Sequence, residues 1–227
     1  MARRSPPPLP PLPTQEHEGA LWAAGCARVA GVDEVGRGPI AGPVVAGAAV
    51  LPDLSGLEHP DRGLLRDSKT LSSAQLLRAD ALVRALALGV GIGAASSAEI
   101  DAQGIAPATR LAMRRALDAL TEAIGAPPCH LLVDAFPLDW HRTPCTPLVK
   151  GDARSAAIAA ASIVAKVHRD ALMVALDAAH PGYGLAAHKG YAAATHLEAV
   201  ARLGPSPVHR RSFSPFRPVL FESPTGG

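Results

Sequence analysis

The stretch GVDEVGRGPIAGP, residues 31–43, begins within one short run rich in valine and alanine, residues 27–33, and ends just before a second such run, residues 44–51. Runs of this length and composition, bounded by glycine and proline, are typical of β-strands. The glycines and prolines between the two runs predict a tight connection. Because Asp33 and Glu34 stand at the end of the first run, the segment predicts two neighbouring strands with a pair of carboxylates where one of them ends.

The rest of the chain alternates between strand-like and helix-like patterns. Three further apolar runs of strand length lie at residues 89–95, 130–133 and 146–150. Apolar residues at helical spacing predict helices at residues 72–88, 98–103, 108–124, 155–179 and 192–203. This order predicts an α/β fold, with a five-stranded mixed sheet flanked by helices and a helical C-terminal extension.

Length and composition indicate one globular domain. The chain has 227 residues, of which 48% are hydrophobic and 19% charged, so it can bury a core without a metal or a disulfide. Residues 1–19, with six prolines between positions 6 and 13, predict a disordered tail, and a ligand for an SH3-like partner is the alternative. We expect the domain to cover residues 20–211 and an irregular tail to cover residues 212–227.

Simple counts exclude several classes of protein. The three cysteines are an odd number without CxxC spacing, which argues against a zinc site or a disulfide framework and favours a reducing compartment. No apolar run reaches the roughly 18 residues that span a bilayer. The first residues also lack the apolar segment of a secretory signal. We therefore expect a cytoplasmic protein with no membrane association.

Acidic residues recur where the predicted strands end. Asp134 closes the fourth apolar run and Asp152 precedes the long helix, much as Asp33 and Glu34 close the first run. Strand ends of an open α/β sheet can converge on one crevice. Four crowded carboxylates cannot all be ionised without cations. The pattern therefore predicts two divalent metal ions, about 4 Å apart, at a site that hydrolyses a phosphate ester.

The turn after the first strand carries groups that suit a phosphate. Gly36, Arg37 and Gly38 offer backbone amides beside a guanidinium group. The same letters satisfy the dinucleotide-binding pattern G-x-G-x-x-[GA], but that pattern needs a helix at the glycines and an acid about 20 residues later. Here a strand follows the glycines and the acids precede them, so a dinucleotide cofactor is the weaker interpretation.

Further motifs follow along the chain. They are DSKTLS at 67–72, VD at 133–134, KGD at 150–152, IAAASIVAKVHRD at 158–170, YG at 183–184, HKGY at 188–191 and GPSPVHR at 204–210. Together with residues 31–43 they extend over about residues 29–216. On these motifs and their order, the chain resembles the bacterial ribonuclease HII family.

The resemblance implies a ribonuclease H-like fold. It also implies an endonuclease that cuts the RNA strand of RNA:DNA hybrids and nicks duplex DNA on the 5′ side of a single embedded ribonucleotide. The four acids would then hold two Mg²⁺ or Mn²⁺ ions, and the products would carry 5′-phosphate and 3′-hydroxyl ends. The turn at residues 36–38 would sense the ribose 2′-hydroxyl, and Tyr191 would stack at the RNA-to-DNA junction.

The other expected substrate contacts are polar side chains outside the acidic group: Ser68, Lys69, Lys166, Arg169 and Lys189. For Lys166 and Arg169, a solvated helix face is an equally good interpretation. The histidines of the C-terminal motif are expected to hold loops or contact phosphate rather than bind metal. Ala192 and Ala193 stand where the family usually has Gly-Thr, a difference that bears on substrate affinity and on no metal ligand.

Two other functions stay open on the sequence alone. One is another two-metal nuclease of the same fold, which would cut substrates made only of DNA. The other is a hybrid-binding protein that has lost its catalysis. The favoured interpretation is a monomer whose partners are RNA:DNA hybrids and ribonucleotide-containing DNA duplexes.

Overall fold

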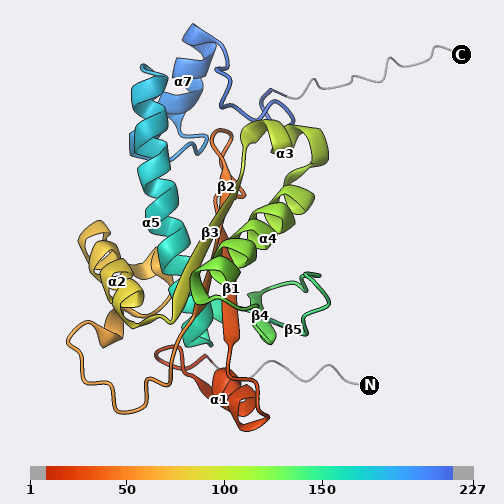
Figure 1. Ribbon diagram of the computed structural model, residues 1–227. Helices are drawn as coiled ribbons and strands as arrows, with labels where there is room; N and C mark the ends of the chain where they lie inside the picture. The colour runs from red at the N-terminus through yellow and green to blue at the C-terminus, as the bar shows by residue number, and fades with distance from the viewer. Residues whose placement is uncertain (1–8, 217–227) are drawn as a thin grey trace, which may run out of the picture.

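The computed structural model describes residues 9–216 and contains one five-stranded mixed sheet (Figure 1). The strands are β1 (Val29–Val35), β2 (Val44–Val50), β3 (Gly89–Ala95), β4 (His130–Asp134) and β5 (Cys145–Leu148). They lie in the order β3-β2-β1-β4-β5, with β1 antiparallel to β2 and parallel to β4. The pairs β2–β3 and β4–β5 are antiparallel and parallel, respectively. The predicted α/β fold with a mixed sheet is confirmed.

Helices flank both faces of the sheet. They are α1 (Glu16–Ala23), α2 (Ser73–Leu86), α3 (Ser97–Gln103), α4 (Ile105–Ile124), α5 (Ala156–Ala179), α6 (Leu185–His188) and α7 (Ala194–Leu203), with 3₁₀ turns η1 (Arg62–Leu64), η2 (Ser68–Thr70) and η3 (Gly151–Ala153). Helix α4 packs on β2 and β3, while α5 packs on β1 and β2 from the other face and carries α2 on its outer side (Figure 1). No helix within residues 9–216 has both the length and the apolar composition needed to cross a bilayer.

Two glycines in the sheet let α5 lie directly on it. A Cβ atom at Gly31 would lie 2.1 Å from the backbone carbonyl carbon of Ala157, and one at Gly47 would lie 2.3 Å from the Ala161 carbonyl oxygen. A larger residue at either position would push the helix away. This close contact holds the first turn of α5, and Asp152 just before it, near the end of β1.

Helix α1 corrects the boundary of the predicted N-terminal tail. It begins at Glu16, inside the segment 1–19 that the proline content predicts to be disordered. The Glu18 side chain is 1% exposed, and its carboxylate accepts hydrogen bonds from the Ser155 hydroxyl (2.7 Å) and the Ala157 amide (2.9 Å). The last residues of the predicted tail therefore help to cap α5, while residues 1–8 lie outside the described part of the chain.

The cysteines give a second correction. Cys26 and Cys129 form a disulfide, and Cys145 is free. The odd number of cysteines and their spacing argued against a disulfide. That prediction is wrong because a count carries no information on which residues lie close together in the fold. The two residues are 103 positions apart but precede β1 and β4, which are neighbours in the sheet, so the sheet order brings them together.

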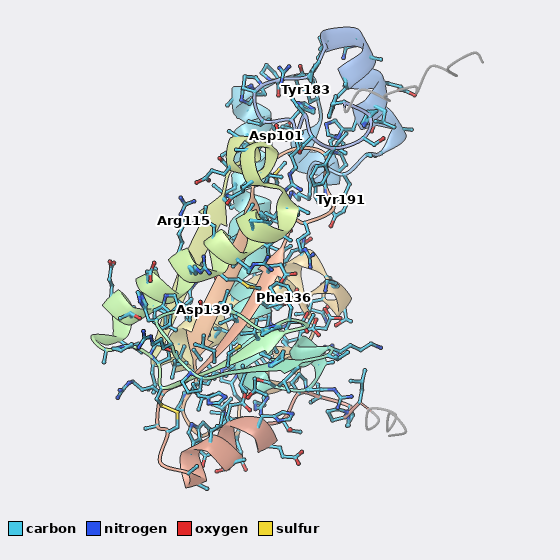
Figure 2. The ribbon with its side chains drawn as sticks, turned by 90° about the vertical axis from the view of Figure 1, so that its right-hand side faces the viewer. Asp101, Arg115, Phe136, Asp139, Tyr183 and Tyr191 are labelled. Atoms are coloured by element: carbon cyan, nitrogen blue, oxygen red, sulfur yellow. A yellow bond between two sulfur atoms is a disulfide. The ribbon has the colours of Figure 1, made fainter. Side chains whose placement is uncertain are left out.

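The C-terminal extension packs beyond one end of the sheet. The second half of α5 projects past the strands and meets α6 and α7 through an apolar cluster: Ala41, Met173, Tyr183, Leu185 and Ala199. Figure 2 shows Tyr183 in this extension and Tyr191 where it borders the sheet. The chain then returns to α3, where the Asp101 carboxylate accepts hydrogen bonds from the amides of Arg211 and Ser212, both at 2.9 Å. The predicted helical extension is confirmed, and residues 217–227 of the predicted tail lie outside the described residues.

Candidate metal centre and nucleic-acid cleft

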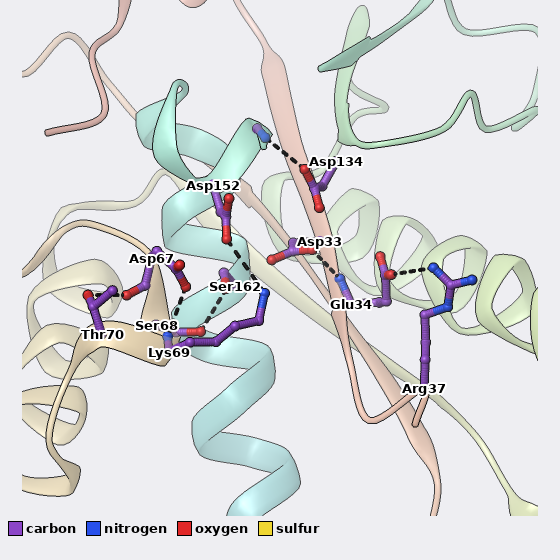
Figure 3. Close-up of polar contacts among 11 residues, drawn as sticks. Asp33, Glu34, Arg37, Asp67, Ser68, Lys69, Thr70, Asp134, Asp152 and Ser162 are labelled. Atoms are coloured by element: carbon purple, nitrogen blue, oxygen red, sulfur yellow. Dashed lines mark hydrogen bonds and ion pairs between the residues drawn. The ribbon is translucent and has the colours of Figure 1, made fainter. Parts of the chain in front are cut away.

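Figure 3 shows the four predicted acids close to one another, with the Glu34 carboxylate turned toward Arg37. Asp33 and Glu34 are successive residues near the end of β1, so their side chains leave opposite faces of the strand. Asp134 ends β4, the parallel neighbour of β1, and therefore lies at the same edge of the sheet. Asp152 lies in η3, directly before α5. The sheet order and the packing of α5 thus gather carboxylates from three separate segments.

Asp33 is the most buried of the four acids. It is 3% exposed, and burial raises its pKa well above the usual value, with Glu34 and Asp134 adding to the effect. One carboxylate oxygen accepts a hydrogen bond from the Glu34 amide at 2.7 Å. The other, Oδ2, is buried and lacks a well-formed hydrogen bond among the described residues, although the nearby Ser162 hydroxyl acts to lower the pKa of the Asp33 carboxyl group. An ionised carboxylate in this place needs a positive neighbour.

Glu34 repeats this feature on the other face of β1. Burial raises the pKa of its carboxyl group, although the Arg37 guanidinium acts in the opposite direction. Its Oε1 accepts a hydrogen bond from Arg37 at 3.2 Å, while Oε2 is buried and unpartnered within residues 9–216. A buried carboxylate oxygen without a partner is costly in an apolar strand end. Two such oxygens on adjacent residues are ligands of the kind that a hard divalent cation prefers. The residues present therefore fit a metal centre.

Asp134 and Asp152 complete the acidic group. The Asp134 carboxylate accepts a hydrogen bond from the Gly151 amide at 2.7 Å, which ties the end of β4 to η3. Burial raises the pKa of Asp152, with nearby Asp67 and Asp134 adding to this, and the ammonium group of Lys69 lies 3.8 Å from its Oδ2. In the described chain no three acidic, imidazole or thiol groups enclose a cation-sized space as they stand. The acids therefore face a common space without forming a closed ligand shell.

A cleft of about 450 Å³ opens beside the acids. Its walls comprise Glu34, Val35, Gly36, Arg37, Gly38, Ser68, Lys69, Ser162, Lys166, Arg169 and Tyr191. Every substrate-binding residue expected from the sequence lines it except Lys189, whose ammonium group donates to the Ala186 carbonyl at 2.6 Å. A larger hollow of about 590 Å³, lined mainly by residues 10–15 and by Trp22, contains none of the acids described above. The smaller cleft is therefore the one associated with the chemistry.

Arg169 lies in the cleft wall, where its expected phosphate contact stays a prediction. It is 1% exposed, and its guanidinium donates to the backbone carbonyls of Pro43 and Lys189, both at 3.1 Å. A solvated helix face, the alternative interpretation, is wrong for it, because the side chain is buried. Gly36 lies directly over this side chain with a φ of +88°, and a Cβ there would be 2.1 Å from the Arg169 Nε atom. Arg169 therefore supports the glycine turn from beneath.

Two polar residues of the site were missed at the level of sequence. Arg210 is fully buried and donates to three carbonyls of the turn: Gly36 at 2.6 Å, Arg37 at 2.9 Å and Gly42 at 2.9 Å. Burial, together with Arg169, lowers its pKa to about 9. The Ser162 hydroxyl lies 2.8 Å from that of Ser68 in the cleft wall. An isolated serine in an alanine-rich helix is the signal that could have identified Ser162.

Comparison with known proteins gives the same family at several levels. A family model described as Ribonuclease HII matches residues 30–215. Ribonuclease HII of Synechococcus sp. is 50% identical over 205 residues, covering 90% of each chain. Ribonuclease HII of Geobacillus kaustophilus is 49% identical over 208 residues, covering 90% of this chain and 75% of its own.

Solved structures agree with these likenesses. The ribonuclease H2 of Pyrococcus horikoshii OT3 superposes with a TM-score of 0.68 at 25% identity, covering 84% of this chain and 95% of that one. Bst-RNase HIII, solved in complex with Mn²⁺, superposes with a TM-score of 0.65 at 23% identity over 84% of this chain and 68% of its own, a likeness of fold. With a family match over most of its length and relatives at about half identity, this chain belongs to the ribonuclease HII family.

Proposed function

We propose that the chain is an endoribonuclease that hydrolyses the RNA strand of RNA:DNA hybrids and nicks duplex DNA on the 5′ side of a single ribonucleotide, leaving 5′-phosphate and 3′-hydroxyl ends. The observation that carries the proposal is the pair of buried, unpartnered carboxylate oxygens on Asp33 and Glu34, beside a cleft walled by a glycine turn and basic side chains. Carboxylates in a nucleic-acid cleft need cations between themselves and phosphate.

Asp33, Glu34, Asp134 and Asp152 would hold two Mg²⁺ or Mn²⁺ ions. Such ions supply an activated water and neutralise charge on the departing 3′ oxygen. The raised pKa values of Asp33, Glu34 and Asp152 mean that protons compete with cations for these oxygens. Burial lowers the pKa of Lys69, but Asp33 and Asp152 outweigh this and raise it, so Lys69 remains a positive partner for the acids.

The turn at residues 36–38 and Tyr191 form the wall that would recognise the ribose. Arg210 holds the Gly36 and Arg37 carbonyls toward the protein interior. A 2′-hydroxyl both donates and accepts, so backbone groups of a glycine turn can read it without contacting a base. Tyr191 is 51% exposed, and its ring lies 3.6 Å from where a Cβ of Gly38 would be, so it offers a flat face beside the turn.

The cleft also contains exposed cations suited to phosphate. Arg37, Lys69 and Lys166 line it, and the Lys166 ammonium group is paired with Asp170 at 2.6 Å. We also propose a cytoplasmic location and a monomeric state, the latter supported by the fact that the acids and the cleft walls all come from a single chain.

The test uses a DNA duplex with one embedded ribonucleotide, incubated with Mg²⁺ and resolved on a denaturing gel. We expect a single nick 5′ of the ribonucleotide by the wild-type chain. Asp134→Asn should abolish cleavage but retain binding, measured by fluorescence anisotropy. The exposed Asp139→Asn is the matched control and should cleave normally. Cutting of an all-DNA duplex would instead favour another two-metal nuclease, and binding without any cleavage by the wild type would favour a non-catalytic protein.

A further inference from the structure

Three histidines lie beneath the loop that carries Tyr191. His188 ends α6, His196 lies in α7, and His209 follows α7 in the returning C-terminal segment. His196 and His209 are 0% and 1% exposed, and the rings of His188 and His196 stack with centroids 4.1 Å apart. Buried imidazoles need partners for both ring nitrogens, and each of these rings has them.

The hydrogen-bond partners fix where the protons lie. The Ser206 amide is 3.0 Å from His209 Nδ1, and an amide can only donate, so Nδ1 of His209 carries no proton. The neutral ring then carries its proton on Nε2, which lies 3.0 Å from His196 Nε2 and donates to it. His196 must therefore carry its own proton on Nδ1, which donates to the Tyr191 carbonyl at 2.7 Å. One backbone amide thus orders a chain of donations in a single direction.

His188 follows the same rule on the other side of the loop. The Gly190 amide donates to its Nδ1 at 3.2 Å, so its Nε2 carries the proton and donates to the Tyr183 carbonyl at 2.8 Å. The hydrogen bonds thus define which nitrogen donates and which accepts in each of the three rings. We name the series Ser206–His209–His196–Tyr191 the histidine relay.

The surroundings of the histidine relay favour the neutral form. Burial lowers the pKa of His209 to about 4, and its charged neighbours are all basic: His196 of α7, His180 at the end of α5 and Arg211. Burial also lowers the pKa of His196, whose ring stacks on that of His188 at the end of α6. The histidine relay is therefore uncharged at neutral pH.

The segment that carries His209 also bonds to residues 40–42, which follow the glycine turn. The Gly42 amide donates to the Val208 carbonyl, and the Arg210 amide donates to the Ile40 carbonyl, both at 2.8 Å. The Ile40 amide in turn donates to the Gly190 carbonyl at 2.9 Å. Residues 40–42, which follow the glycine turn, are therefore bonded both to the segment that bears His209 and, directly, to the loop that carries Tyr191.

We propose that His196 and His209 are positioning residues, whose neutral, one-directional relay holds the Tyr191 backbone at a fixed distance from the glycine turn and so sets affinity for the ribonucleotide junction. The inference rests on the proposed function, because it assigns a support for Tyr191 as a substrate contact. Loss of the last donation, from His196 to Tyr191, frees the loop without touching the acids. It therefore raises KM and leaves kcat close to that of the wild type.

The tautomers can be measured without any substrate. Two-dimensional ¹H–¹⁵N spectra of the histidine rings in the whole chain should show His209 protonated on Nε2 only and His196 protonated on Nδ1 only, unchanged between pH 6 and pH 8. The opposite tautomer at either ring, or titration of either ring near pH 6.5, would overturn the proposal. Because this measurement involves no cleavage, its failure is distinct from failure of the proposed function.

Two substitutions of one residue separate positioning from stability. His196→Asn keeps an N–H near the place of Nδ1 and loses only the acceptor for His209, so it should lower the Tm and raise KM by clearly less than the substitution that removes the donation to Tyr191. His196→Gln keeps a polar group near the place of Nε2 and loses the donation to Tyr191, so KM for the single-ribonucleotide duplex should rise about tenfold. Equal changes in KM for the two variants, or a parallel loss of kcat, would show a purely structural role and overturn the proposal.

Discussion

The acidic cleft and the histidine relay are both buried polar clusters, but their polar atoms are satisfied to different degrees. In the relay, each ring nitrogen of His196 and His209 has a partner. In the cleft, Asp33 and Glu34 each keep one buried oxygen without a partner among the described residues. Nearly all buried polar groups in proteins are hydrogen-bonded, so an unpartnered oxygen requires an explanation, and two of them on adjacent acids beside further carboxylates fit a bound cation. The hydrogen bonds of the relay fix the local backbone, whereas the carboxylate oxygens of the cleft are suited to bind cations.

The same contrast appears in the electrostatics. Basic neighbours surround the relay and the rings remain neutral, so no uncompensated charge is buried there. Burial, followed by the acidic neighbours Glu34 and Asp134, raises the pKa of Asp33, so its ionised form is unfavourable in the fold. The cation-free cleft therefore lowers stability at neutral pH, while the relay does not. The expected effects below run from the largest to the smallest.

Asp33→Asn should have the largest effect and should act on activity and stability in opposite directions. Cleavage should fall by at least about 10³-fold, because the most buried acid of the site is lost. The Tm of the protein in EDTA should rise, because the folded-state pKa of Asp33 is raised and the ionised carboxylate destabilises the fold above that pKa. This gain should shrink as the pH falls through the raised pKa, where the wild-type carboxyl also becomes protonated.

Thermal unfolding with EDTA and with Mg²⁺ provides the measurement. Mg²⁺ should raise the Tm of the wild type more than that of Asp33→Asn. Asp139→Asn changes an exposed acid and should leave both Tm values as they are. A lower Tm for Asp33→Asn in EDTA would contradict the picture of a cleft destabilised by its own charges.

Gly36→Ala tests whether the two regions are mechanically connected. The φ of +88° disfavours alanine, and the new Cβ would meet Arg169 Nε at 2.1 Å. Because Arg169 is fixed by two backbone carbonyls, we expect a loss of about 2–3 kcal/mol in the free energy of unfolding and a rise in KM of about tenfold or more. Urea unfolding and steady-state cleavage measure the two effects.

Gly63→Ala is the matched control, since Gly63 has no left-handed φ and no atom within 4 Å of the added Cβ. It should change the free energy of unfolding by less than about 0.5 kcal/mol. If Gly36→Ala behaved like this control, the turn would be loose and independent of the arginine beneath it.

The sequence predicted the elements that repeat a local pattern. The strands of valine and alanine, the long α5 and the acids at strand ends are each visible within a short window, and the structure places them as expected. The acids could be grouped because parallel neighbours such as β1 and β4 end at one edge of a sheet. The other expected cleft residues were identified through the motifs shared with the family.

What the sequence could not predict depends on contacts between distant segments. The bond between Cys26 and Cys129 requires knowing that β1 and β4 are neighbours. Glu18 belongs to the domain because it caps a helix 137 residues away. Arg169 looks like any cation on a helix face until the turn at Gly36 is seen to cover it. A local window records residue type and spacing but not burial, and burial decides whether a cation binds phosphate or backbone.

Lys166→Gln should give the smallest effect and decides between the two interpretations that the sequence left open for this residue. The Lys166–Asp170 pair is partly exposed (26% and 27% of the side chains) and spaced i,i+4, so its loss should change the free energy of unfolding by about 0.5 kcal/mol or less. If the ammonium group also binds phosphate, KM should rise a few-fold and the slope of log KM against log salt should fall by about one. Asp170→Asn breaks the same ion pair but keeps the cation in the cleft, so it should match Lys166→Gln in stability and the wild type in salt dependence. Identical salt slopes for the two variants would mean that Lys166 is only the partner of Asp170 and that phosphate affinity comes from Arg37 and Lys69 at the cleft wall.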